Sequence, residues 1–154
     1  MEVFRLSRAV YAHTLSGKGA AIRGARWNSK GIELIYTACN RSLAMAEVAV
    51  HFTLATLPGD YRMITVYVPE DIAMKEIPET DLPDEWNIFP HPLCTQQYGN
   101  DFVSENKFCL LKIPSAVTKG DYNILINPSH GDFSRIKILE SVDFPFDRRI
   151  FKPG

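Results

Sequence analysis

Apolar and polar residues alternate along several short stretches of this chain, and turns rich in glycine and proline separate them. Alternation of this kind has the period of a β-strand with one buried face, and it predicts about six strands, mostly antiparallel. The expected strands cover residues 2–6, 32–37, 61–68, 108–113, 122–126 and 136–144. Helices are expected from Asn40 or Ser42 to about Leu57 and from Thr95 to Val103. The mixture predicts a single α+β domain over residues 1–154, with two or three helices.

Two segments lack a regular pattern. Residues 12–31 contain several glycines and are expected to be mostly loop. Residues 70–93 are rich in proline and are expected to form a long irregular connection, with one short turn near residues 84–86. Irregular connections of this length in a small domain are usually functional lids or packed loops.

The most apolar stretch of the chain holds a single carboxylate. Within residues 43–54 this is Glu47, and helical spacing places it among Leu43, Val50 and Leu54. A carboxylate on a buried helix face must be paired, protonated or part of a working site. Glu47 is therefore a candidate functional residue, and a buried ion pair with an arginine is the structural alternative.

A cation and aromatic rings precede this acid. Arg26, Trp27 and Asn28 lie in the glycine-rich segment, and Tyr36 falls on the strand expected at residues 32–37. A guanidinium holds phosphate groups through paired hydrogen bonds, and an aromatic ring can stack on a flat cationic group. The set suits an anionic, ring-bearing ligand from which a cation forms. Arg26 is also the candidate ion-pair partner of Glu47, and Trp27 is expected to be a core aromatic.

Composition and charge narrow the class of protein. The chain is 45% hydrophobic and 23% charged, as in an ordinary soluble globular domain. Its net charge of −1 argues against direct binding to nucleic acid or to acidic membranes. No apolar stretch is long enough to span a membrane and no signal peptide is evident, so we expect a cytoplasmic protein. The three cysteines lack metal-site spacing and are expected to be reduced thiols.

Four motifs in order resemble those of one known family. They are Phe4-Arg5-Leu6; the run Gly24-x-Arg26-Trp27-Asn28, Ile35-Tyr36-Thr37-Ala38 and Leu43-Ala44-x-x-Glu47-x-x-x-His51; the run Ile113-Pro114-Ser115-Ala116-Val117 with Asn123-Ile-Leu-Ile-Asn127-Pro128-x-His130; and the ending Phe144-Pro145-Phe146-Asp147-Arg148-Arg149. Over nearly its whole length the chain resembles the RES-domain proteins, toxins of the RES–Xre toxin–antitoxin systems. Residues 70–93 match nothing distinctive in that family.

This resemblance implies a fold like that of ADP-ribosyltransferases and an activity on NAD. The family's toxins cleave the nicotinamide–ribose bond, with water or phosphate as acceptor, so NAD is a substrate and no cofactor or metal is needed. Some relatives transfer ADP-ribose to a protein instead. The implied partner is an Xre-type helix-turn-helix antitoxin, and DNA would be contacted only through it.

The resemblance also implies roles for particular residues. Glu47 would stabilise the ribosyl cation, Arg26 and Arg5 would hold the pyrophosphate, and Tyr36 would pack on nicotinamide. The expected catalytic set is Glu47, Arg26, Tyr36 and Ser115, and the expected substrate-binding set is Arg5, Arg26, Asn28, Tyr36 and Ser115. Two other functions stay open: a mono-ADP-ribosyltransferase that modifies a host protein, and a non-catalytic nucleotide-binding module, which would not need Glu47.

Several nearby residues are expected to be structural. His51 could act as a base, but a core histidine is an equally good interpretation, so it stays outside the catalytic set. Arg23 is interpreted as a solvated loop charge. Asn127 and His130 are expected to form a structural turn, and His91 stands alone in a loop without metal-ligand spacing.

Overall fold

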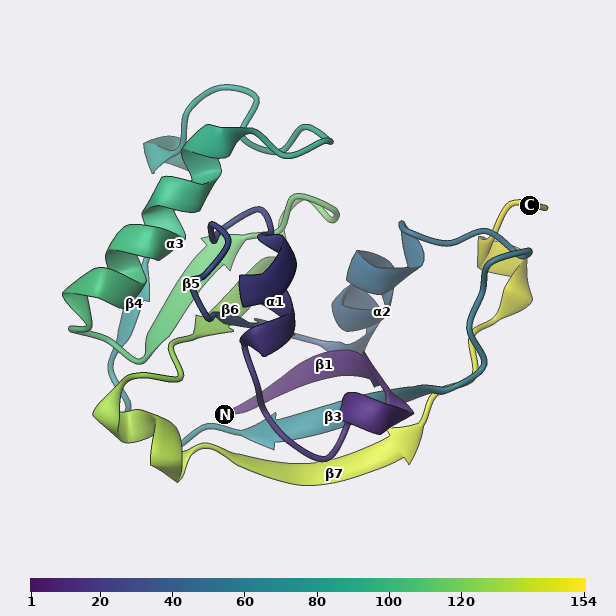
Figure 1. Ribbon diagram of the computed structural model, residues 1–154, viewed down its shortest axis with the longest axis horizontal. Coiled ribbons are helices and arrows are strands. Elements are labelled where there is room, and N and C mark those ends of the chain that lie inside the picture. The colour runs from purple at the N-terminus through teal and green to yellow at the C-terminus, as the bar shows by residue number, and fades with distance from the viewer.

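The computed structural model describes residues 1–154, and its centre is one seven-stranded sheet of order β4-β5-β6-β2-β1-β3-β7 (Figure 1). Neighbouring strands are antiparallel, except that β4 and β5 are parallel. The strands are β1 (Glu2–Arg8), β2 (Ile35–Ala38), β3 (Tyr61–Tyr67), β4 (Met74–Glu76), β5 (Leu110–Pro114), β6 (Tyr122–Ile126) and β7 (Lys137–Asp143). The α-helices are α1 (Lys18–Arg23), α2 (Arg41–Ala49) and α3 (Leu93–Glu105).

The sheet is divided near its middle. β1 and β2 are joined by a single residue pair, Phe4 opposite Ala38, whereas β1 pairs with β3 along its whole length. Figure 1 shows β1, β3 and β7 running along one side of the molecule while β5 and β6 turn away from them. The sheet therefore consists of two half-sheets, β4-β5-β6-β2 and β1-β3-β7, that diverge beyond one shared pair.

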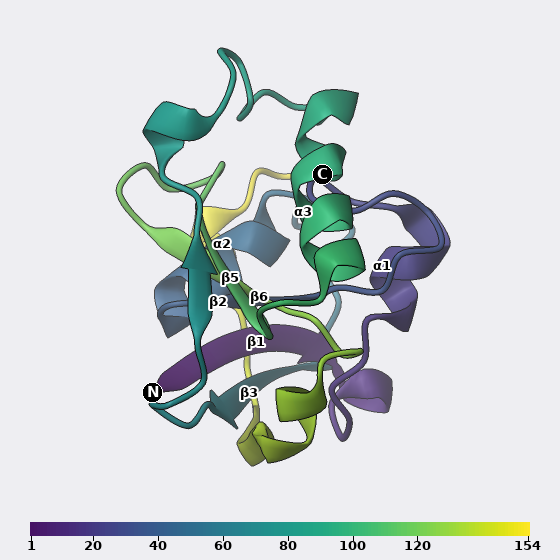
Figure 2. The same ribbon diagram turned by 90° about the vertical axis from the view of Figure 1, so that its left-hand side faces the viewer.

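Each helix covers a different part of this sheet. α3 packs Phe102 against Leu111 of β5 and Leu125 of β6, and Figure 2 shows it standing beside these strands. α2 packs Leu43 and Ala44 against the neighbouring ends of β1 and β2. Burial of the apolar side chains in these clusters drives the folding of both half-sheets.

All six expected strands are present, and the structure adds a seventh. The strand expected at 32–37 begins only at Ile35. The additional strand, β4, lies inside the connection expected to be irregular, and only its middle residue, Lys75, is partly buried. A mostly exposed strand of three residues is too short to show an alternating pattern of apolar and polar residues in the sequence. α1 likewise forms inside the segment expected to be loop, and Gly24 ends it with a φ of 71°.

α2 ends earlier than expected, at Ala49 instead of Leu57. Asn40 caps its first turn, accepting a hydrogen bond of 2.7 Å from the Leu43 amide, as one of the two expected caps. After Ala49 the chain forms turns, and the Leu54 amide bonds the Lys152 carbonyl instead of continuing the helix. Val50 is 60% exposed, so the expected apolar surroundings of Glu47 are wrong on that side.

α3 is slightly longer than expected and is the longest helix, at 13 residues. None of the three is both long and apolar enough to cross a membrane. The three cysteines are free, with Cys109 buried, Cys39 partly buried and Cys94 exposed.

Candidate active site

A cavity of about 930 Å³ opens where the two half-sheets diverge. Its wall is built from β1, β2 and β6, from α2 and the turn after it, from the end of α1, and from the segments at 87–91 and 116–117. The volume lies within the range of sites for drug-sized ligands and cofactors. The wall includes Arg5, Arg23, Arg26, Tyr36, Glu47, His51, Phe89, His91 and Asn123. Four of the six predicted site residues, Arg5, Arg26, Tyr36 and Glu47, therefore meet in one cavity.

Glu47 lies in the last turns of α2 and is half-buried in the cavity wall. The Ser115 hydroxyl donates a hydrogen bond of 2.9 Å to its Oε1 atom. Burial raises the pKa of Glu47, while Ser115, Asn123 and the charges of Arg26 and His51 partly offset this effect. No cation lies within ion-pair distance of Glu47, so the structure does not form the buried ion pair with Arg26.

Ser115 is only 5% exposed and holds Glu47 from behind the cavity wall. Its hydroxyl oxygen accepts bonds of 3.0 Å from the amides of Val117 and Thr118 while donating to Glu47. Ser115 lines a separate hollow of about 220 Å³ on the other side of this turn, not the main cavity. The geometry therefore makes Ser115 a positioning residue for the Glu47 carboxylate.

Arg26 reaches the cavity from the loop after α1. Its Nη1 atom donates to the carbonyls of Trp86 at 2.7 Å and Ile88 at 3.0 Å, which ties the 84–91 connection to the wall. Burial lowers the pKa of Arg26, and the charge of Glu47 counteracts this. Its Nη2 and Nε atoms have no hydrogen-bond partner within the protein, so one side of the guanidinium is available to a ligand.

Arg5 projects from β1 into the division of the sheet. Its only hydrogen bond is a long one of 3.4 Å from Nη1 to the Ser16 carbonyl, and no carboxylate pairs with it. Burial lowers the pKa of this guanidinium. A buried arginine without a counter-ion is costly in free energy, and an anionic ligand would remove that cost.

Tyr36 and Asn28 form one hydrogen-bonded unit behind the wall. The Tyr36 hydroxyl donates to Asn28 Oδ1 at 2.7 Å and accepts from the Trp27 amide at 3.0 Å, and burial raises its pKa. Asn28 is fully buried, and its Nδ2 atom bonds the carbonyls of Ala20, Ser29 and Ile32. Only the Tyr36 ring remains free for a ligand. Asn28 lies outside the wall and positions Tyr36 instead of reaching into the cavity.

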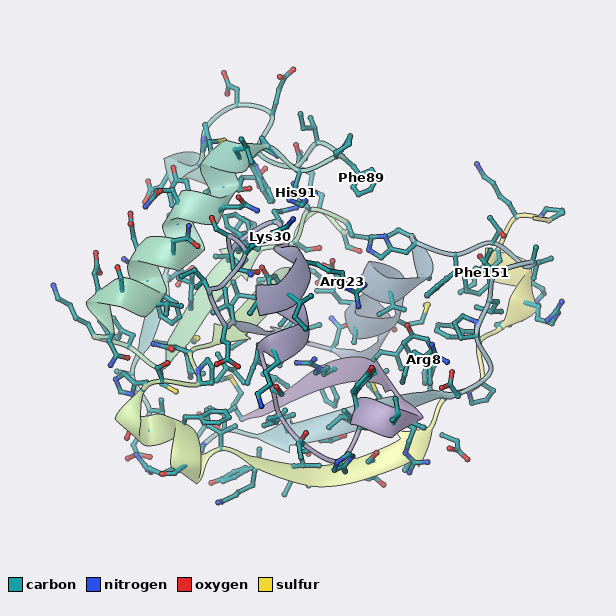
Figure 3. All side chains as sticks on the ribbon, viewed as in Figure 1. Arg8, Arg23, Lys30, Phe89, His91 and Phe151 are labelled. Carbon is teal, nitrogen blue, oxygen red and sulfur yellow. The ribbon has the colours of Figure 1, made fainter.

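Other residues of the wall were not expected there. Arg23, interpreted as a solvated loop charge, lines the cavity, and Figure 3 shows it between α1 and α2. His51 is exposed at the rim, so its interpretation as a core histidine is wrong, and its ring centre lies 6.2 Å from that of Phe89. Phe89 and His91 come from the proline-rich connection and line the cavity, and Figure 3 shows them above α1 and α2. The sequence signal that could have identified them is the presence of two ring side chains within the proline-rich connection.

Three of the residues predicted to be structural behave as expected, namely Trp27, Asn127 and His130. Trp27 is 3% exposed and packs against Trp86, with ring centres 5.9 Å apart. Asn127 is fully buried, and His130 caps the following turn by accepting a bond from the Asp132 amide at 3.1 Å. No group of three or more His, Cys, Asp or Glu side chains is placed to hold a metal ion.

The site thus brings together one carboxylate of raised pKa, three guanidiniums and an aromatic face. Positive groups along the wall suit an anionic ligand, and a carboxylate beside them can stabilise a cation that forms during a reaction. This combination agrees with cleavage of a glycosidic bond through a cationic ribosyl species.

Known proteins resemble the chain over almost its whole length. It is 32% identical over 148 residues to the Prs ADP-ribosylating toxin of Sphingobium sp. (strain YBL2), covering 95% of this chain and 92% of that one. It is 32% identical over 155 residues to the protein named Toxin Res of Photorhabdus laumondii, covering 99% and 98%. These relatives are of nearly the same length, so no large region is unmatched on either side.

A solved structure shares the fold. The crystal structure of the M. tuberculosis MbcT–MbcA toxin–antitoxin complex contains a chain that superposes with a TM-score of 0.76 at 21% identity, over 94% of this chain and 84% of that one. The expected single α+β domain, with mostly antiparallel strands, is confirmed. The model of the RES domain family matches residues 2–147, and the chain therefore belongs to the RES domain family, as its motifs predicted.

Proposed function

We propose that this protein is the toxin of a toxin–antitoxin pair and that it consumes NAD by cleaving the nicotinamide–ribose bond. The observation that carries the proposal is the Glu47 carboxylate, held by Ser115 at the wall of a cavity that also presents unpaired arginines. The relatives named as toxins, one of them an ADP-ribosylating toxin, support the same chemistry.

In this mechanism Glu47 acts on the ribose. The C1′–N bond of NAD breaks, nicotinamide leaves as a neutral molecule with the bonding electron pair, and positive charge develops on the ribose. The ionised Glu47 stabilises that charge, and Ser115 fixes the carboxylate toward it. Water then bonds to C1′ and releases a proton, giving ADP-ribose. Phosphate in place of water would give ADP-ribose 1-phosphate.

The remaining groups of the wall orient the substrate. Arg5 and Arg26 bind the pyrophosphate, because planar guanidiniums match phosphate oxygens. The ring of Tyr36 packs on the cationic nicotinamide. NAD is a substrate in this scheme, and neither a cofactor nor a metal takes part.

A protein acceptor is the second candidate function. The name of the Sphingobium relative states that it ADP-ribosylates Prs, and the cavity here opens to solvent beside the exposed Phe89 and His51. The same cationic ribosyl species would then be captured by a nucleophile on that protein. A non-catalytic nucleotide-binding module is less favoured, because such a module gains nothing from burying Glu47.

The proposed partner is an Xre-type helix-turn-helix antitoxin, and DNA is reached only through it. The structural neighbour was solved as a toxin–antitoxin complex, which supports an antitoxin partner.

We propose that the antitoxin places an acidic or carboxyl-terminal segment near Arg26 and Tyr36. Because both ligands would use the same guanidinium, a saturating NAD analogue should lower the antitoxin's apparent affinity. Undiminished NAD binding in the complex would rule out occlusion. The pair would act in the cytoplasm, where its substrate is abundant.

Product analysis tests the reaction. The purified protein is incubated with NAD, with and without phosphate, and the products are identified by mass. Free nicotinamide with ADP-ribose or its 1-phosphate supports NAD cleavage and names the acceptor. Intact NAD, combined with transfer of labelled ADP-ribose to a single protein of a cell lysate, would favour the protein-modifying alternative.

A further inference from the structure

Arginines pair very differently inside and outside the cavity. Arg8, Arg62, Arg135 and Arg149 each form an ion pair with an aspartate. The three arginines of the cavity wall, Arg5, Arg23 and Arg26, form none. Of the other two unpaired arginines, Arg41 lies 4.5 Å above the ring of Phe4, a residue of the same wall, and Arg148 lies in the tail. The unpaired guanidiniums are thus concentrated at the cavity.

This charge exceeds what NAD requires. The wall carries three guanidiniums and a single carboxylate, and no lysine or aspartate. In the proposed function, Glu47 faces the cationic nicotinamide riboside, and Arg5 with Arg26 neutralises the two charges of the pyrophosphate. Arg23 is left without a counter-charge from either the protein or the dinucleotide.

Arg23 and Arg26 serve different ends of the cavity. The charge of Arg26 acts on Glu47 and His91, which marks the end where the bond breaks. Arg23 is the last residue of α1 and lines the cavity from that side, where its charge, with that of Arg8, also acts on Tyr61 at the start of β3. Figure 3 shows Arg23 between α1 and α2, and its side chain lines the cavity. A dinucleotide with its nicotinamide at Glu47 would extend its adenosine toward Arg23.

We propose that Arg23 is a specificity residue that binds a third phosphate, the 2′-phosphate of the adenosine ribose, so that the cavity accepts NADP as a substrate alongside NAD. The inference rests on the proposed function and adds a substrate to it. An arginine suits this role because its planar fork donates two parallel hydrogen bonds to a phosphate. The bond that breaks and the products at the nicotinamide end are unchanged, and the other product is the 2′-phosphorylated ADP-ribose.

Kinetics with the two dinucleotides test the inference. Nicotinamide release is measured from NAD and from NADP with the wild-type protein, Arg23→Gln and Arg23→Lys. Arg23→Gln should lower kcat/KM for NADP about tenfold through KM, with NAD changed by less than about threefold, because only NADP loses a charged hydrogen bond. The kcat/KM of Arg23→Lys for NADP should fall between the values of the wild type and Arg23→Gln. Added salt should reduce the difference in kcat/KM for NADP between the wild type and Arg23→Gln, because Arg23 is exposed and its charge is screened.

Arg8→Gln is the matched control. Arg8 is also an exposed arginine near Tyr61, but it pairs with Asp60 and lies outside the wall, so its loss should leave the NADP-to-NAD ratio unchanged. An unchanged ratio in Arg23→Gln, or cleavage of NAD without cleavage of NADP, would overturn the inference and leave the proposed function standing.

A binding measurement tests the inference about Arg23 independently of turnover. Calorimetric titration with ADP-ribose and with 2′-phosphorylated ADP-ribose needs no reaction. Tighter binding of the phosphorylated ligand, lost in Arg23→Gln, supports the role of Arg23. Equal affinity for the two ligands overturns it. Release of nicotinamide from neither dinucleotide, despite binding, contradicts the proposed function instead.

Discussion

Burial of the Glu47 carboxylate has a cost in stability that can be measured. Its pKa is raised mainly by burial, so the folded protein holds a proton that the unfolded chain releases between the ordinary and the raised pKa. The stability that this carboxyl contributes is therefore present at low pH and lost as the pH rises through the raised pKa. A Glu47→Gln substitution keeps the volume and can still accept from Ser115, but it carries no charge.

Glu47→Gln should therefore raise the melting temperature at neutral pH, by about 2–4 °C if roughly 1 kcal/mol is recovered. The gain should shrink as the pH falls and disappear below about pH 4, where the wild-type carboxyl becomes protonated in both states. Thermal melts of both proteins across this range make the comparison. A variant that is less stable at every pH would contradict the burial argument.

Arg26 is the second residue whose chemistry can be isolated. Arg26→Lys keeps the charge but cannot hold the Trp86 carbonyl and a phosphate through one planar fork. Affinity for NAD, measured by calorimetry, should fall by about tenfold or more, and Arg26→Ala should lower it further. Arg8→Lys, outside the cavity, serves as the control. Equal NAD affinity in all of these proteins would make Arg26 purely structural.

At the scale of the element, the start of α2 controls where Glu47 lies. Asn40 accepts from the Leu43 amide, so Asn40→Ala removes a helix cap and should cost about 1 kcal/mol of stability. Ser42→Ala is the control, because Ser42 was the other expected cap but is exposed and caps nothing. Denaturant unfolding measures both variants. Equal losses would show that the cap contributes nothing specific.

Sequence patterns located the elements better than their ends. β3 and β6 were predicted almost residue by residue, because each is a short, mostly apolar and β-branched run between turns, the pattern of a buried strand. β4 and α1 were missed because they are short and mostly exposed, and their pairing is set by distant parts of the chain. α2 was predicted too long because apolar residues continue past Ala49, where the chain instead forms turns and the Leu54 amide bonds the distant Lys152 carbonyl.

The residues of the candidate site were likewise predicted well in some places and poorly in others. Arg5, Arg26, Tyr36 and Glu47 lie in or beside regular elements within the family's motifs, and they meet in the cavity. The side-chain directions of Asn28 and Ser115 are set by hydrogen bonds that the motifs do not show. Bonds to nearby carbonyls, such as that of Ala20, place Asn28 behind the wall, and a bond to the distant Glu47 places Ser115 behind that carboxylate. The loop residues Phe89 and His91 were missed because their position depends on how residues 84–91 fold back over the cavity.

At the scale of the whole molecule, the divided sheet provides the space for the site. A continuous sheet would fill this position with backbone, whereas the single pair between Phe4 and Ala38 lets β1 and β2 diverge around Arg5 and Tyr36. Residues from both half-sheets therefore line one cavity.

Expression in a bacterium should stop growth and lower the cellular NAD content, and co-expression of the neighbouring antitoxin gene should restore both. Growth curves with enzymatic NAD assays measure the two effects, and a Glu47→Gln strain serves as the control. Growth arrest with normal NAD would favour modification of a host protein, and a labelled-NAD transfer gel would then show the modified band.

The central claim is that the Glu47 carboxylate drives cleavage of the nicotinamide–ribose bond. Its most direct test is the rate of nicotinamide release from NAD by purified wild-type protein and by Glu47→Gln, with NAD binding measured in parallel. The account predicts release by the wild type, and a loss of about 10²-fold or more in the variant at nearly unchanged NAD affinity. Equal rates in the two proteins would contradict it.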